Sequence, residues 1–228
     1  IGHVLTLIFG LLYLVTFWRG SKAVGFFYNV AFVGASFSFG IVFVNDVVKA
    51  KRFRVPRALL SDDNVHYFVL ASFWLLLAPV TTLALPPFVL FSFFHVLTYT
   101  RSTLLPLFLT STSLSDRIYR FVREYNDKSL EAAAFLELVL LMWLIARCVA
   151  FRHKSLATLL VFSFFAKLRY ENSIFTRQVI KSWEFQVDTM VAKHELPPAV
   201  KSTWISVKQI IRNYVGHPLA AKVEEKTK

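Results

Sequence analysis

The chain has 228 residues, of which 56% are apolar and 24 are phenylalanine, and its net charge is +12. An average soluble domain is about 45–50% apolar, so the composition argues against a soluble domain. In a soluble protein this charge would suggest nucleic acid. Here the basic residues lie beside apolar segments, so we predict anionic lipid as the partner and no nucleic acid. Cys148 is the only cysteine in the sequence, so no internal disulfide can form.

Two apolar segments open the chain, at residues 1–18 and 23–48. The first ends in Trp18 and Arg19, an aromatic residue followed by a charge, as is typical of the membrane–water interface. The second contains three glycines, which are Gly25, Gly34 and Gly40. Small residues allow two helices to pack closely in a bilayer, although glycine is also common in membrane helices without this role.

A basic linker follows, with five lysine and arginine residues between positions 49 and 57. Such a cluster beside a membrane span usually stays cytosolic. It can also attract anionic lipid, by about 1 kcal/mol per charge near the surface. We favour the topology signal over a specific lipid site. Ser61, Asp62 and Asp63 then supply an N-cap and acidic first-turn residues for the next helix.

The stretch from Asn64 to Thr100 contains no Lys, Arg, Asp or Glu. As a single helix its 37 residues would extend about 55 Å, whereas the hydrocarbon core of a bilayer is about 30 Å thick. The chain must therefore turn, and proline favours a turn because it lacks an N–H and clashes with the preceding helical turn. We predict a helical hairpin with arms at 64–84 and 88–105. The predicted turn residues are Pro79 and, at the tip itself, Pro86 and Pro87.

A second hairpin is predicted, with arms at 130–146 and 155–170. The apolar part of its second arm is shorter than the roughly 20 residues of a full crossing, so its depth in the bilayer stays open. The turn at 147–154 is basic and would itself prefer the cytosolic side, so its sidedness also stays open. With both hairpins in place, residues 49–61, 106–128 and the C-terminus lie on the cytosolic side.

Two amphipathic helices are predicted after residue 170. We therefore divide the chain into a transmembrane helical domain at 1–170 and a cytosolic region at 171–228, which ends in a charged tail. The second helix, at about 198–215, carries an apolar stripe with a tryptophan beside a basic stripe, a pattern typical of helices that lie in the bilayer interface. Packing of the apolar stripe on the protein itself is an equally good interpretation. The predicted membrane- or partner-binding residues are Val200, Lys201, Trp204, Val207, Lys208, Ile211 and Arg212.

The sequence contains no motif for catalysis, a cofactor or a metal, and we predict none of the three. His66 and His95 lie on opposite arms of the first hairpin, so they could approach each other and form a metal or proton-transfer site. The favoured interpretation is that each binds a nearby carbonyl. Glu137 lies within an apolar segment, where a carboxylate needs a partner. We predict a structural pair between Glu137 and either Lys167 or Arg169.

Several short stretches carry a family resemblance. They are Asp62-Asp63-Asn64-Val65-His66-Tyr67, Ala78-Pro79-Val80-Thr81, Phe91-Ser92-Phe93-Phe94-His95-Val96-Leu97-Thr98-Tyr99-Thr100, Lys167-Leu168-Arg169-Tyr170, Asn172 and Phe175-Thr176-Arg177. The chain resembles the Transmembrane protein 33 family, which includes fungal pore-membrane proteins of the nuclear envelope. The positions that match the family's motifs are His66, His95, Thr98, Tyr99, Arg169 and Tyr170.

The resemblance implies a multi-pass protein of the endoplasmic reticulum and nuclear envelope, without catalytic residues. Family members are associated with endoplasmic reticulum shape, reticulon-type partners, and nuclear pore distribution or assembly. In the fungal branch a C-terminal amphipathic helix contacts membrane and nuclear import receptors, and position matching assigns that role to 198–214.

We therefore expect an all-α polytopic membrane protein that is not an enzyme and that shapes or organises membrane. Its expected partners are the lipid bilayer, reticulon-type proteins or nucleoporins, and a nuclear import receptor. One alternative is an accessory subunit of a larger membrane-protein insertion or transport complex. A second alternative is a small intramembrane enzyme that uses His66 or His95.

Overall fold

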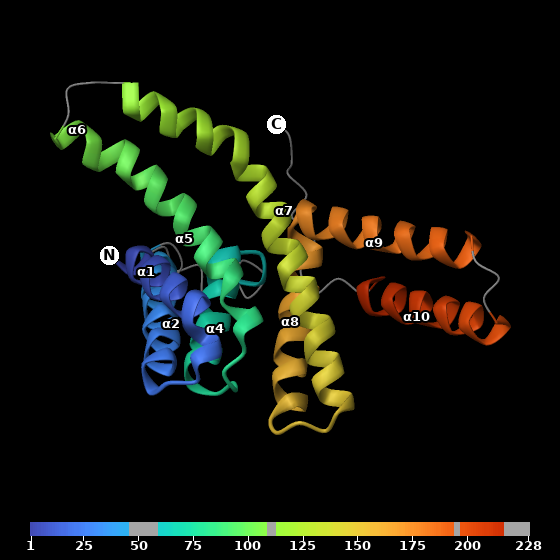
Figure 1. The fold of residues 1–228 in the computed structure, drawn as a ribbon. Coiled ribbons are helices and arrows are strands. Elements are labelled where there is room, and N and C mark those ends of the chain that lie inside the picture. Colours follow the sequence, from blue (N-terminus) through green and yellow to red (C-terminus); the bar gives the residue numbers. More distant parts are fainter. Residues whose placement is uncertain (46–58, 109–112, 194–196, 217–228) are drawn as a thin grey trace.

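Helices form the described part of the chain (Figure 1). The computed structural model describes residues 1–45, 59–108, 113–193 and 197–216, and over these ranges it contains no strand, which confirms the predicted all-α class. The basic linker at 49–57 and the charged tail from residue 220 lie outside the described residues. The principal helices are α1 (Gly2–Thr16), α2 (Lys22–Val42), α4 (Asp63–Leu76), α5 (Pro86–Tyr99), α6 (Leu105–Phe108), α7 (Ser113–Val149), α8 (Ser155–Asn172), α9 (Ile174–Lys193) and α10 (Pro198–Gly216).

Among the described residues, four helical stretches are long and apolar enough to cross a membrane, so the protein is a multi-pass membrane protein. They are Gly2–Arg19, Lys22–Asn45, Thr82–Phe108 and Ser113–Val149. The helices α4 and α8 do not reach the length and hydropathy of a full span by themselves, and crossing by these two predicted arms stays a prediction.

Small residues bring α1 and α2 into close contact. A Cβ atom on Gly34 would lie 2.7 Å from the carbonyl oxygen of Gly2 and 2.8 Å from the amide nitrogen of Thr6. The hydroxyl of Thr6 donates a hydrogen bond to the carbonyl of Ala31, 3.1 Å away. A Cβ atom on Gly40 would lie 3.0 Å from the ring of Phe68 in α4. Of the two interpretations that the sequence left open, the structure supports close helix packing at Gly34.

Replacement of Gly34 by alanine should destabilise the protein by about 1–3 kcal/mol, because the new methyl group forces two backbones apart. The matched control is Gly25→Ala, since a Cβ atom at Gly25 would meet nothing within 4 Å. Thermal unfolding in mild detergent should show a lower midpoint for Gly34→Ala alone. Equal midpoints for the two variants would contradict the close approach of α1 and α2.

The connection between α4 and α5 lies earlier in the chain than predicted. The predicted first arm continues to residue 84, but α4 ends at Leu76, and Pro86 and Pro87 form the first turn of α5. Proline is tolerated at the start of a helix because its missing N–H needs no partner there. The connecting segment at 77–85, which contains Pro79, is held by two tyrosines, since Tyr28 accepts a hydrogen bond from the Thr81 amide and Tyr13 bonds to the Thr82 hydroxyl.

The arms of this hairpin also separate. The helix α4 packs on α2 and α8, whereas α5 packs on α1 and α7 (Figure 1). In the second predicted hairpin, α7 and α8 pack together across a short connection, and its insertion in the membrane as a hairpin stays a prediction. The first of its helices is longer than predicted: at 37 residues α7 includes the polar stretch from residue 113 and extends about 55 Å, beyond the thickness of a bilayer core.

Candidate functional site

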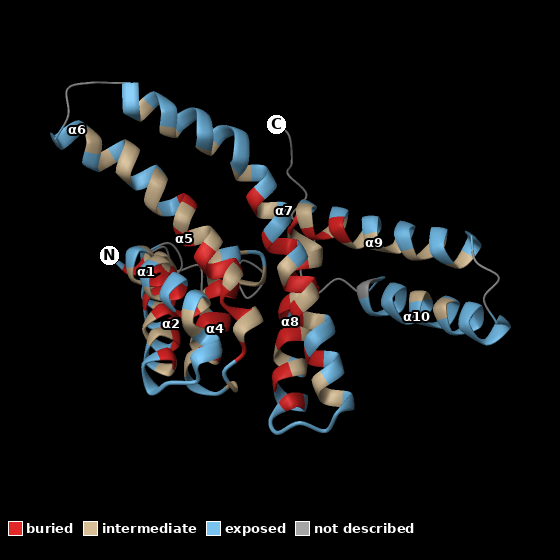
Figure 2. Cartoon of the chain, in the orientation of Figure 1, coloured by how far each residue is buried: buried red, intermediate tan, exposed pale blue. Residues whose placement is uncertain are grey.

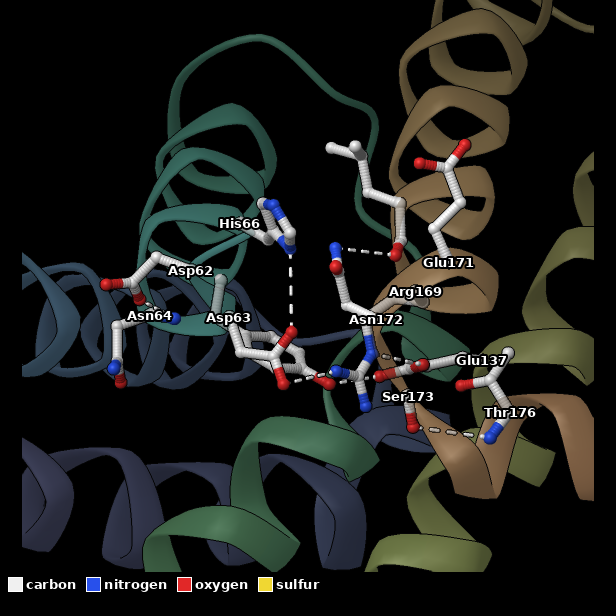
Figure 3. A network of polar contacts seen from close by, with 12 residues as sticks. Asp62, Asp63, Asn64, His66, Glu137, Arg169, Glu171, Asn172, Ser173 and Thr176 are labelled. Atoms are coloured by element: carbon white, nitrogen blue, oxygen red, sulfur yellow. Dashed lines mark hydrogen bonds and ion pairs between the residues drawn. The ribbon is translucent and has the colours of Figure 1, made fainter. Parts of the chain in front are cut away.

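A buried cation lies where α4, α7 and α8 meet (Figure 3). Arg169 of α8 is only 4% exposed, and its Nη1 atom lies 2.7 Å from the Oδ2 atom of Asp63 at the start of α4. Its Nε atom lies 3.5 Å from the Oε2 atom of Glu137 in α7, which is equally buried. The predicted pairing of Glu137 with a basic residue of the facing arm is confirmed, and Arg169 is the partner.

Hydrogen bonds extend this network around Arg169. The hydroxyl of Tyr67 donates to the Oε1 atom of Glu137 at 2.5 Å. The side-chain amide of Asn172 donates to the carbonyl of Leu60 at 3.0 Å, and the imidazole Nε2 atom of His66 lies 3.1 Å from the same carbonyl. Two motif segments that are about a hundred residues apart in sequence therefore meet in space, and they fix the start of α4 against the end of α8.

The network is a structural junction. Its charged groups face each other, since Arg169 lies within ion-pair distance of both Asp63 and Glu137. Removal of one partner from a buried ion pair leaves the other charge without compensation, which is far more costly than the net worth of the pair. Two carboxylates surround Arg169 because a buried guanidinium has several N–H groups, and its apolar surroundings supply no acceptors for them.

Substitution of Arg169 by leucine should destabilise the protein by about 3–5 kcal/mol, because Asp63 and Glu137 lose their cation. Thermal unfolding in mild detergent measures the effect, with the exposed Arg123→Gln as the control. The double substitution Arg169→Leu with Glu137→Gln should recover part of the loss. A double variant no more stable than Arg169→Leu alone would contradict the buried pairing.

The histidines that could have formed a metal or proton-transfer site have different partners. His95 stacks on His3 of α1, with ring centroids 4.4 Å apart, and the His3 Nδ1 atom lies 3.1 Å from the Ser92 hydroxyl. The His66 Nε2 atom lies within hydrogen-bond distance of the Leu60 carbonyl, which is the favoured interpretation for this residue. In the part of the chain that the structure describes, no group of three or more His, Cys, Asp or Glu residues could hold a metal ion.

The remaining motif positions are more exposed. Thr98 and Tyr99 lie on the surface near the end of α5. Tyr170 contributes through its backbone, since its carbonyl accepts a hydrogen bond from the Arg177 guanidinium at 3.0 Å. That guanidinium also donates to the carbonyl of Glu171, so Arg177 joins the end of α8 to the start of α9.

The helices α9 and α10 lie side by side and extend away from the bundle (Figure 1). Polar contacts join the two helices. The indole N–H of Trp204 and the ammonium of Lys208 both donate to Asp188 at 2.7 Å, and Arg212 pairs with Glu184 at 3.2 Å. The Tyr214 hydroxyl donates to the carbonyl of Ser163, which anchors the end of α10 beside α8.

The predicted binding residues of α10 therefore divide into two sets. Trp204, Lys208 and Arg212 point toward α9 and are engaged there. The second set is exposed and, apart from Lys201, apolar, as the pale blue of α10 indicates (Figure 2). Its members are Val200, Lys201, Val207 and Ile211, which were predicted, and Ile205, Ile210 and Tyr214.

The sequence-based prediction missed the acidic residues of α9 that contact α10. Glu184 and Asp188 are four residues apart, as are Lys208 and Arg212, so each pair lies on one face of its helix. This matched charge spacing was a signal for two helices side by side. Asp63 was recognised as a first-turn acid only, and its pairing with Arg169 had no local signal.

The chain is similar to one known protein family over almost its whole length. The profile of the family described as Transmembrane protein 33/Nucleoporin POM33 matches residues 1–216. The chain belongs to this family. The Saccharomyces cerevisiae relative "Pore membrane protein of 33 kDa" is 31% identical, over 91% of this chain and 78% of the relative.

Two other fungal members of the family are similar over nearly the whole chain. "Tetra-spanning protein 1" of Schizosaccharomyces pombe is 30% identical, over 96% of this chain and 83% of its own length. "Nucleoporin POM33" of Chaetomium thermophilum is 29% identical, over 93% of this chain and 83% of its own length. No solved structure matches the chain significantly. The names of these relatives describe membrane proteins and a nucleoporin, and none names an enzyme.

Asp188 should control the contact between α9 and α10. Hydrogen bonds from Lys208 and then Trp204 hold the pKa of Asp188 below its usual value. The contact is therefore complete at neutral pH and is lost only as the pH falls through that lowered pKa. Spin labels at Thr189 and Ser206, in a Cys148→Ser background, should move apart in Asp188→Asn at neutral pH.

The control for this measurement is Asp116→Asn, which removes an exposed acid in the first turn of α7 and should leave the distance unchanged. The unsubstituted protein should show the longer distance only in strong acid. An unchanged distance in Asp188→Asn would mean that other contacts hold α10 against α9.

Proposed function

We propose that the protein is a non-enzymatic membrane protein of the endoplasmic reticulum and nuclear envelope that shapes or organises membrane, in particular at nuclear pores. The names of its relatives support this proposal, since they describe a pore membrane protein, a nucleoporin and a "Pore and endoplasmic reticulum protein of 33 kDa". The four candidate spans in the described part of the chain supply an anchor in the bilayer.

The observation that carries the proposal is the exposed apolar face of α10. Val207, Ile210 and Ile211 are exposed although they are large and apolar, and Ile210 is 67% exposed. The end of α10 contacts Ser163, near the middle of α8, so α10 lies on the side of α9 that is nearer the α7–α8 turn (Figure 1). This position suits a helix that rests in the bilayer interface with its apolar side chains in lipid.

Insertion of such a helix adds area to one leaflet, which is a physical route to membrane curvature. The hairpins of the membrane domain also add area mainly to one leaflet, when only their short turns reach the opposite side of the bilayer. Lys201 is exposed, and Lys208 and Arg212 lie close to the same face, so anionic headgroups are suitable partners. Reticulon-type proteins, nucleoporins and a nuclear import receptor are the protein partners that the family resemblance supports.

A fluorescent label tests the depth of α10 in the intact, reconstituted protein. With the label on the new cysteine of an Ile211→Cys variant, made in the Cys148→Ser background, we expect quenching by nitroxide lipids and a blue-shifted emission. With the label on a Gln209→Cys variant in the same background, on the opposite face of the helix, we expect quenching by aqueous reagents instead. Equal quenching at both positions would show that α10 does not rest in the interface.

Charge on the apolar face should remove the membrane-shaping activity and leave the protein membrane-bound. The double substitution Val207→Glu with Ile211→Glu places two charges on the face that rests in lipid, and the energy cost of burying them there opposes insertion of the helix. The matched control, Ser202→Glu with Gln209→Glu, adds the same charge on the opposite face. Tubulation of vesicles by the purified protein is the measurement, and equal tubulation by both double variants would exclude α10 as the active element.

The alternative of an accessory subunit in a larger insertion or transport complex predicts a different result. In that case both double variants would still co-purify with the same membrane-protein partners, and the purified protein alone would not deform vesicles.

A further inference from the structure

A shallow cavity of about 390 Å³ lies between α7 and α9, outside the junction at Arg169 and away from α10. Its volume falls in the range of small-molecule sites, about 300–1,000 Å³. The residues on which the argument depends are Lys128, Glu131, Phe135, Ser182, Trp183 and Gln186.

The wall of this cavity is polar at one end and apolar at the other. Lys128 and Glu131 lie on α7, and Ser182 and Gln186 face them from α9. The apolar part is an aromatic pair, in which Phe135 and Trp183 meet edge to face with centroids 5.5 Å apart. A surface of this kind suits an amphiphile, because one molecule can satisfy both ends.

The cavity lies where α7 changes from polar to apolar. The helix is polar up to Lys128 and apolar from residue 130, so this level corresponds to the headgroup region of a bilayer. Lys128, Glu131, Phe135 and Met142 lie along one face of α7. Phe135 is 45% exposed and Met142 is 54% exposed, so an apolar strip leads from the cavity toward the membrane core.

Two opposite charges line the polar end. Within the described residues neither Lys128 nor Glu131 forms an ion pair, although they are three residues apart on the same helix; the Lys128 ammonium rests over the Tyr125 ring at 4.7 Å. A phosphate beside Lys128 and an ammonium group beside Glu131 would satisfy both side chains. A purely anionic headgroup would instead place negative charge against Glu131, which disfavours it.

We propose that this cavity binds one zwitterionic glycerophospholipid of the ethanolamine type. Its phosphate contacts Lys128, its ammonium group donates to Glu131, and its acyl chains pass over Phe135 and Trp183. The bound lipid fixes α9 at the membrane surface. The site is independent of the proposed role of α10, because none of its residues belongs to that helix.

Native mass spectrometry of the intact protein in mild detergent tests the proposal. Added dioleoylphosphatidylethanolamine should remain bound about tenfold more than dioleoylphosphatidylglycerol, the anionic comparison lipid. Lys128→Gln should lower retention of the ethanolamine lipid about tenfold. Glu131→Gln should reduce the preference and raise retention of the anionic lipid. Ala132→Trp, which fills the cavity, should remove both lipids, and Arg123→Gln is the control that should change nothing.

Equal retention of the two lipids by the unsubstituted protein, or an unchanged preference in Glu131→Gln, would overturn the proposal. Retention of neither lipid would overturn it as well. In that case, protection of the cavity from hydrogen exchange only in the presence of a co-purified protein would identify it as a protein-binding surface.

Discussion

The fold depends on how a guanidinium is accommodated away from water. Arg169 is almost completely buried, and removal of such a charge from water costs several kcal/mol unless partners compensate it. Asp63 and Glu137 supply the compensation from two other helices. The positions of α4, α7 and α8 are therefore linked by electrostatics, because displacement of any one helix would leave a buried charge without its partner.

The same junction joins the charged network to the apolar core. Tyr67 donates its hydroxyl to Glu137, and the Arg169 guanidinium lies over its ring at 5.3 Å. The other contacts of this ring are aromatic, with Phe39 of α2, Phe88 and Phe91 of α5, and Phe165 of α8. One side chain of α4 thus contacts α2, α5, α7 and α8, so α5 is positioned without close backbone packing on α4.

The C-terminal pair of helices differs from this core in the kind of contact that holds it. Long polar side chains connect α10 to α9, and most apolar residues of α10 remain exposed. Exposed ion pairs of this kind contribute little stability, whereas buried pairs that lose a partner cost much. Loss of a contact between α9 and α10 should therefore cost far less stability than loss of a partner of Arg169.

The sequence by itself determined the class of the protein and the approximate position of its apolar helices. Apolar length between charged residues is a local property, so the first two segments and the α7–α8 hairpin could be predicted. A pair between Glu137 and either Lys167 or Arg169 could also be predicted, because a carboxylate inside an apolar segment requires a cation and few are available. Only the structure identifies Arg169 as the partner. The small-residue face at Gly34 was indicated, since close packing needs small side chains.

Tertiary structure decided where the connection before α5 lies and which side chains meet across distance. Proline is compatible both with a loop and with the first turn of a helix. Tyr13 and Tyr28 hold residues 81 and 82 in the connecting segment, and Pro86 and Pro87 begin α5. A helical wheel predicts that Trp204 lies near an apolar stripe, but it cannot show that Asp188 lies opposite. Local periodicity determines the faces of a helix, and only the packing of the other helices determines what each face contacts.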